Sequence, residues 1–170
     1  QVKDVEIIGN KKFEGQLLGT DFNKNEVYIK PLYPDDFYSI GIMDIETGQI
    51  KNTLRLRKGN IQAPTDVYNP TYMQYMDGQY YLIDWFEKIM VFNHKLKHLY
   101  SCMFNHMRYF INFYKIEESP FFVIGRKEVR YKEAICPVEI YQMIERRIPK
   151  FIKKIHEASR GGKPGHPRRV

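Results

Sequence analysis

The sequence predicts an all-β fold built from repeats, and three observations carry this prediction. Short runs of alternating apolar and polar residues recur in groups of four, at an interval of about fifty residues. Residues that favour strands are common, since aromatic residues make up 15% of the chain and 13 residues are Tyr. Residues typical of turns separate the runs. Because four strands per repeat are typical of a β-propeller blade, we expect about three antiparallel four-stranded blades.

The first blade is expected at residues 16–57, after a lone strand at 5–8. Its strands are predicted at 17–22, 26–33, 38–45 and 49–57. Asn tolerates left-handed backbone, Pro presets φ and Gly allows positive φ, so these residues identify the turns between the strands. The turns are predicted at Asn23–Asn25, Pro34–Asp36 and Glu46–Gly48.

The second blade, at residues 70–104, has the clearest pattern. Its strands are predicted at 70–76, 79–84, 88–92 and 96–104. Asp77-Gly78 lies between two alternating runs and is a strong signal for a two-residue hairpin turn, since both central residues of that turn have positive φ.

These residues resemble the NHL-type and related six-bladed propeller families. In those blades an apolar strand ends in Asp, and after a short turn a basic residue opens an apolar strand that ends in Phe. Ile83-Asp84, Lys88-Ile89 and Val91-Phe92 stand in those places, although the turn holds bulky Trp85 and Phe86 where the family has Asn or Gly. The resemblance implies six blades in the complete ring and a structural, not catalytic, role for Asp84.

The third blade is expected at residues 107–158. Its strands are predicted at 107–115, 121–124, 138–144 and 150–157, with a turn at Glu117–Pro120 and a long charged insertion at 125–137. An alternative for the end of the chain is a basic amphipathic helix, because apolar residues from Tyr141 to Ile155 recur at spacings of three and four. Pro149 interrupts that stripe and favours the strand pair.

Charge is concentrated at the C-terminal end of the chain. The net charge is +7, and residues 126–170 hold 13 Lys or Arg against 5 acidic residues. The tail at 159–170 has too few apolar residues to pack and is predicted to be disordered. Nucleic acid or another anionic surface is therefore an alternative partner for the basic end.

Neither the cysteines nor the histidines predict a metal site or cofactor. Cys102 and Cys136 are too few for a disulfide framework, and we expect buried or half-buried thiols, with a bridge between them as an alternative in an exported protein. Ligand-type side chains recur every four residues at His94, His98, Cys102 and His106. A strand would hold neighbouring members about 13 Å apart, too far to share one ion.

The sequence predicts a non-catalytic scaffold that binds a protein or a small ligand. It contains neither a GxSxG motif nor a phosphate-binding glycine loop. In a propeller, binding residues lie on the loops of one rim. The candidate binding residues are Asp35, Asp36, Phe37, Trp85, Phe86, Glu87, Arg126, Lys127 and Arg130. Trp85 is either an exposed contact residue or folds back on the neighbouring blade.

Three blades are expected to be half of a ring. The chain is then either a fragment of a longer six-bladed propeller or associates with itself through open strand edges. The sequence contains no run of eighteen apolar residues, so it predicts no transmembrane helix. The compartment is open, since a signal peptide or lipid anchor preceding Gln1 would place the chain outside the cytoplasm.

Overall fold

The computed structural model describes residues 15–32, 34–59, 62–85, 88–103, 109–130, 133–143 and 150–160, and all regular structure in these ranges is β-strand. Sheet 1 holds β1 (Gln16–Asp21), β2 (Glu26–Lys30), β3 (Phe37–Asp44) and β4 (Ile50–Arg57). Sheet 2 holds β5 (Pro70–Met76), β6 (Gln79–Asp84), β7 (Lys88–Asn93) and β8 (His98–Met103). Sheet 3 holds β9 (Tyr109–Lys115), β10 (Phe121–Arg130), β11 (Glu133–Gln142) and β12 (Lys150–Arg160). The predicted all-β class, with three four-stranded antiparallel sheets, is confirmed.

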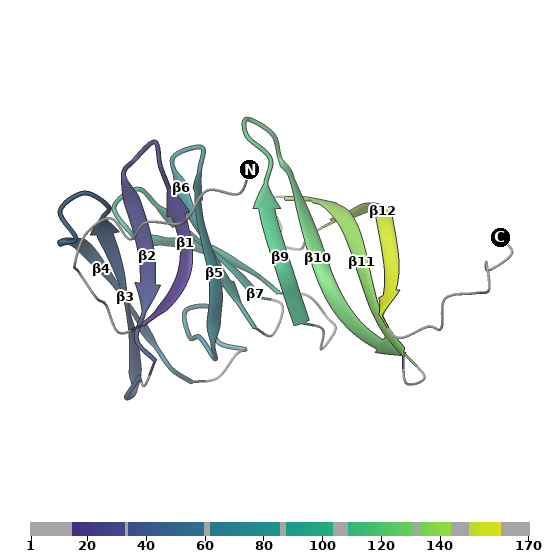
Figure 1. Ribbon diagram of the computed structural model, residues 1–170, viewed down its shortest axis with the longest axis horizontal. Helices are drawn as coiled ribbons and strands as arrows, with labels where there is room; N and C mark the ends of the chain where they lie inside the picture. Colours follow the sequence, from purple (N-terminus) through teal and green to yellow (C-terminus); the bar gives the residue numbers. More distant parts are fainter. Residues whose placement is uncertain are drawn as a thin grey trace, which may run out of the picture.

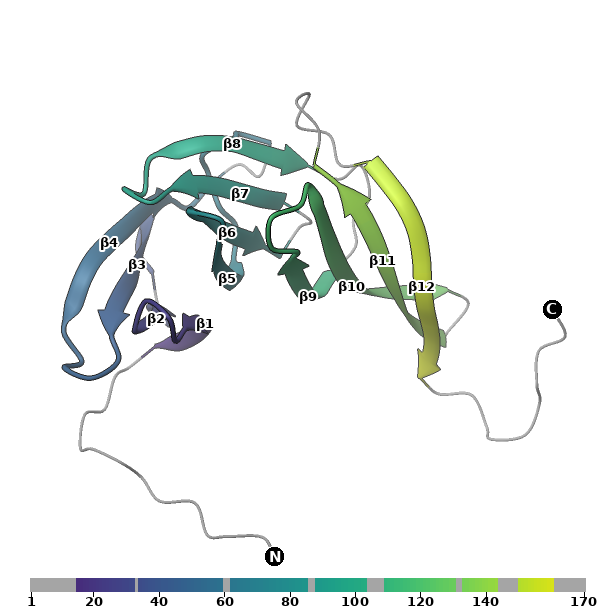
Figure 2. The same ribbon diagram turned by 90° about the horizontal axis from the view of Figure 1, so that it is seen from above.

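The three sheets are arranged as a fan (Figure 1). Figure 2 shows their first strands, β1, β5 and β9, near the middle and their last strands, β4, β8 and β12, on the outside. The fan is open on the side opposite β8. Within the described part of the chain, sheet 2 therefore packs on both faces, whereas sheets 1 and 3 each pack on one.

Several predicted turns have the left-handed backbone that their residues favour. Asp77 and Gly78 have φ of 52° and 76°, as the two-residue hairpin turn requires. Asn25 has φ of 57° and Gly48 has φ of 66°, each in the turn predicted from it. The sequence therefore sets the ends of these strands through local turn chemistry.

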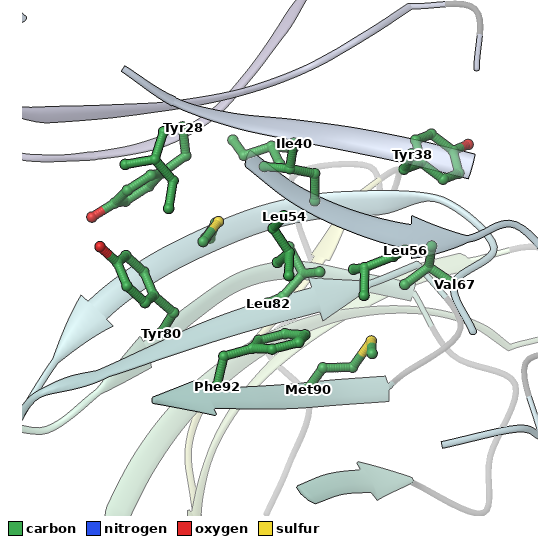
Figure 3. Packing of buried hydrophobic residues seen from close by; sticks show 13 residues of the cluster. Tyr28, Tyr38, Ile40, Leu54, Leu56, Val67, Tyr80, Leu82, Met90 and Phe92 are labelled. Carbon is green, nitrogen blue, oxygen red and sulfur yellow. The ribbon is translucent and has the colours of Figure 1, made fainter. Parts of the chain in front are cut away.

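Two apolar cores hold the sheets together. One lies between sheets 1 and 2, and the other lies between sheets 2 and 3. Successive residues of β6 point to opposite faces, so that Tyr80 and Leu82 belong to the first core, whereas Tyr81 and Ile83 belong to the second. Figure 3 shows the first core, in which Tyr28 and Tyr80 approach with their hydroxyl groups. The two central strands of sheet 2 are thus buried on both sides.

A glycine permits the close contact between sheets 1 and 2. A Cβ atom at Gly19 of β1 would lie 2.1 Å from the carbonyl oxygen of Met73 in β5. No side chain fits at that distance, so any larger residue must push the two strands apart.

The third sheet differs from its prediction in one segment. The predicted insertion at 125–137 is largely strand, because β10 extends to Arg130 and β11 begins at Glu133, with Glu128 opposite Ile135 and Arg130 opposite Glu133. The error has a physical cause. Alternation reveals a strand only when one face is buried, whereas backbone pairing does not require an apolar face.

Residues 150–160 form a strand and not the alternative helix. β12 pairs with β11 from Gln142 opposite Lys150 to Ala134 opposite Arg160, which confirms the predicted strand pair. The strand also includes Ser159 and Arg160, which were predicted to begin the tail. The predicted lone strand at 5–8 and the tail from 161 lie outside the described residues.

Candidate functional site

The candidate site lies at the rim where β2–β3, β4–β5 and β6–β7 connect, at the lower edge of sheets 1 and 2 in Figure 1. Backbone hydrogen bonds tie these connections together. The amide of Lys58 donates to the carbonyl of Asp36 at 2.8 Å, and the amide of Trp85 donates to the carbonyl of Asn69 at 3.0 Å. The connections from three places in the sequence thus form one surface.

Asp84, at the end of β6, organises this rim. Its side chain is fully buried and accepts three backbone hydrogen bonds. The donors are the amides of Tyr68 at 2.7 Å, Asn69 at 2.6 Å and Trp85 at 3.0 Å. A buried carboxylate with three such donors holds the β4–β5 connection against β6, which is the structural role that was expected for Asp84.

Two buried lysines flank Asp84. Lys30 donates to the Asn69 side-chain oxygen and, at 2.7 Å, to the Pro70 carbonyl. Lys88 donates to the carbonyls of Ala63 and Asp66. Burial lowers the pKa of both ammonium groups, and the negative charge of Asp84 opposes that shift. Both lysines therefore stabilise the β4–β5 connection through polar contacts inside the protein.

A cavity of about 620 Å³ opens beside this cluster. Its described lining is Gln16, Lys30, Leu32, Pro34, Tyr38, Lys58, Tyr68, Asn69 and Trp85. Tyr68 and Trp85 form a stacked pair with ring centroids 5.9 Å apart. The Tyr38 hydroxyl donates to the carbonyl of Tyr68 at 3.1 Å and so supports that pair. The described lining holds two lysines and no carboxylate, which gives the cavity a positive character.

Of the predicted binding residues, Trp85 lines the cavity. It is half-buried and lies against Tyr68, so it folds onto the neighbouring connection and still faces the cavity. Asp35 and Asp36 are exposed in the adjacent turn but do not line the cavity. Phe37 lies 3.9 Å from the Arg55 guanidinium, measured to the ring centroid.

The side chains of the other five predicted binding residues lie outside the described structure. Phe86 and Glu87 lie outside the described residues. Arg126, Lys127 and Arg130 belong to β10 in sheet 3, and their side chains lie outside the described part of the structure.

Sequence reasoning missed Lys30, Tyr38, Lys58 and Tyr68. Lys30 gave a usable signal, because it follows Tyr28 at the strand period of two and must therefore point inward with it. A lysine at an inward strand position indicates a buried polar cluster. Tyr68 gave no such signal in the sequence, since its position depends on a hydrogen bond from its amide to the Asp84 carboxylate, sixteen residues away.

His94 lies in a turn, and His98 and Cys102 lie on β8, as expected. The His98 ring packs edge-on against Phe92, and its Nε2 lies 2.8 Å from the Ser101 hydroxyl oxygen. Cys102 is buried and Cys136 is half-buried, both as free thiols, which confirms that prediction. His106 lies outside the described residues. In the described ranges, no three residues among His, Cys, Asp and Glu are grouped so that they could hold a metal ion.

No protein-family model matches the chain, and no curated protein matches it significantly. Among the described residues there is no helix long and apolar enough to cross a membrane.

Proposed function

We propose that this chain is a non-catalytic binding scaffold of the six-bladed β-propeller type, related to the NHL-like families. Its rim cavity between sheets 1 and 2 binds a small molecule that has a planar ring and an anionic group. The observation that carries the proposal is the cavity itself, which combines a stacked Tyr68–Trp85 pair with Lys30 and Lys58.

The chemistry of the lining supports this ligand class. Aromatic faces provide a large apolar contact area for a ring, and ammonium groups attract a carboxylate or phosphate. Lys58 is exposed, whereas Lys30 is only 5% exposed and is held by two oxygen acceptors. Lys58 is therefore the residue free to move toward a ligand, and Lys30 contributes fixed positive charge.

The single tryptophan of the chain makes the test direct. Trp85 is the only tryptophan, so its fluorescence reports on the cavity alone. We expect benzoate to shift the emission in a saturable manner and benzamide, which has the same ring without the charge, to bind about tenfold more weakly. Phenyl phosphate and cyclohexanecarboxylate separate the contributions of the anion and of the planar ring.

Two lysine variants provide the matched comparison. Lys58→Gln should weaken benzoate binding about tenfold and leave benzamide binding unchanged. Lys95→Gln, in the exposed turn between β7 and β8, should change neither. Equal binding of benzoate by both variants would contradict the role of Lys58. No saturable response to any of the four probes up to about 10 mM would contradict the proposed function.

A second candidate function is binding of nucleic acid or an anionic surface through β12. This strand is at the edge of sheet 3 and exposes lysines next to apolar side chains. The exposed residues are Lys150, Phe151, Ile152, Lys153 and Lys154. Exposed cations beside an aromatic ring are typical of surfaces that bind single-stranded nucleic acid. Binding of single-stranded RNA that weakens steeply as salt rises would support it, and no binding at low salt to RNA, DNA or anionic vesicles would exclude it.

A further inference from the structure

Sheet 1 has an apolar face with no neighbour in the described structure. Leu17 is paired with Ile29, and Ile29 is paired with Gly41, so these three residues share one face. The side chain of Ile50 covers Gly41, since its Cδ1 would lie 2.9 Å from a Cβ atom built there. Leu17 is 59% exposed and Ile50 is 54% exposed. We call Leu17, Val27, Ile29, Gly41 and Ile50 the free face of sheet 1.

Sheet 3 has a second such face. Tyr114 is paired with Val123, and Val123 is paired with Ile140, on the side opposite to the buried side chains of Phe122 and Ile124. Tyr114 is 52% exposed, and Val123 and Ile140 are half-buried. We call Tyr114, Val123 and Ile140 the free face of sheet 3.

The middle sheet shows how such faces pack when they are covered. Its Tyr80 side is covered by sheet 1 and its Tyr81 side by sheet 3, and both residues are only 2% exposed. In chain order, the free face of sheet 1 corresponds to the Tyr80 side, and the free face of sheet 3 corresponds to the Tyr81 side. The two free faces are therefore the two unlike halves of an interface that the molecule already uses twice.

We infer that a second copy of this chain covers both faces. The free face of sheet 1 packs on the partner's free face of sheet 3, and the reciprocal contact forms around a two-fold axis. The open side of the fan (Figure 2) would receive the second fan, and the two copies would together form a closed ring of six sheets. This inference goes beyond the proposed function and does not depend on any ligand. Its basis is continuity with the two existing interfaces and the exposure of three apolar side chains on these faces, Leu17, Ile50 and Tyr114.

The charges at the outer strands predict how salt affects this association. Arg55 of β4 pairs with Ser39 on the free side of sheet 1, and Lys153 of β12 pairs with Ile140 on the free side of sheet 3. Since both sides carry positive charge, salt should screen their repulsion and strengthen a dimer of this chain. An acidic partner protein on the same faces would show the opposite dependence.

The first test is the mass of the full chain in solution. One chain has a mass of 20.4 kDa, so sedimentation equilibrium should give a dimer of about twice that mass, favoured by added salt. A monomer at about 100 μM would overturn the inference. A series of larger masses would also overturn it, because the faces would then associate without closing a ring.

Substitutions then identify the faces. Leu17→Asp and Tyr114→Asp should each weaken the dimer by about tenfold or more, since each places a charge in an apolar contact. Phe22→Asp is the matched control, because Phe22 is 81% exposed in the β1–β2 turn and belongs to neither free face. If only one of the two variants dissociates, like faces are paired and the inference is wrong.

Mixing the two variants distinguishes a lost contact from a lost fold. A mixed dimer of Leu17→Asp and Tyr114→Asp has one contact with both substitutions and one contact with neither. Mixing should therefore restore association above that of either variant alone. Variants that keep the far-ultraviolet circular dichroism of the wild type but do not associate on mixing would overturn the proposed pairing of unlike faces.

Discussion

The two interfaces of the middle sheet use equivalent positions with different chemistry. In β2, Glu26, Tyr28 and Lys30 point toward sheet 2, and in β6 the residues at the same period, Gln79, Tyr81 and Ile83, point toward sheet 3. Each tyrosine donates to the residue two positions before it, Tyr28 to Glu26 at 3.1 Å and Tyr81 to Gln79 at 3.1 Å. The first interface thus carries charges where the second is neutral.

The cavity lies beside the charged residues of the first interface. Around Lys30 the chain must supply acceptors, and the Asn69 side chain and the Pro70 carbonyl provide them from the β4–β5 connection. The cavity opens at this polar end of the interface. The second interface instead packs a series of rings, with Phe113, Phe122 and Tyr141 at centroid distances of 5.5 and 5.6 Å. At the equivalent strand positions the first interface therefore carries charged groups and the second a neutral amide and an apolar side chain, although the second interface buries Lys115 and Glu139 elsewhere.

The largest effect is expected from removing the buried charge of Asp84 at the rim of the first interface. Asp84→Ala leaves the amides of Tyr68 and Asn69 without their acceptor and removes the negative charge beside the two buried lysines. We expect a loss of about 3–5 kcal/mol in the free energy of unfolding, measured by urea denaturation. Asp35→Ala, in an exposed turn, is the control and should change stability by less than about 0.5 kcal/mol. Equal stabilities of the two variants would show that Asp84 does not organise the rim.

A smaller effect is expected where the first interface brings two backbones together. Gly19→Ala would place a methyl group against the carbonyl of Met73 and should cost about 1–3 kcal/mol in stability. Gly125→Ala is the matched control in sheet 3, since its Cβ atom would meet Asn112 only at 3.7 Å, an ordinary contact. Urea denaturation of both variants measures the difference, and a loss of the same size at both sites would contradict the close approach of β1 and β5.

Exchanging one residue between the equivalent positions tests the comparison directly. Lys30→Ile gives β2 the residue that β6 has at Ile83, but it leaves the Asn69 and Pro70 acceptors without a donor. We expect a loss of about 1–2 kcal/mol in stability and weaker benzoate binding in the Trp85 fluorescence assay. The reciprocal control, Lys51→Ile, removes an exposed lysine at the opposite rim and should leave benzoate binding unchanged. Unchanged binding by Lys30→Ile would exclude a contribution of its charge to the cavity.

The sequence predicted most of the fold because the fold depends on local signals. Asp77-Gly78, Asn25 and Gly48 identify turns through the φ values that their residues allow, and alternation between these turns identifies strands with one buried face. The strand residues within 125–137 were not predicted, since charged strands can pair through their backbones without alternating apolar and polar side chains.

The site was less predictable, because contacts distant in sequence build it. Trp85 was predicted to be a binding residue because it is the only tryptophan and lies at a predicted turn, and it lines the cavity. Lys30 lies in the cavity through its inward position on β2, but its acceptors are about forty residues away, as the contact with Pro70 shows. No pattern in one sequence connects residues across that separation. The turns on this rim were predicted from the sequence, but the contacts between its connections were not.

The smallest expected effect concerns the pH dependence of the two equivalent tyrosines. Burial raises the pKa of Tyr28, and the negative charge of Glu26 raises it further; burial also raises the pKa of Tyr81, which has a neutral acceptor in Gln79. Above pH 10 the unfolded chain loses these phenol protons while the folded protein keeps them, so stability is complete below pH 10 and falls as pH rises.

Each buried tyrosine then contributes a loss of at most about 1.4 kcal/mol per pH unit above 10. Tyr28→Phe and Tyr81→Phe should each reduce this slope, because each removes a buried phenol whose pKa is raised. Urea denaturation at pH values from about 9 to about 10.5 measures the slopes. Tyr28→Phe should in addition lower stability at neutral pH more than Tyr81→Phe, because it removes a donor from a buried carboxylate instead of an amide. Equal losses at neutral pH would mean that the charge of Glu26 makes no difference between the two interfaces.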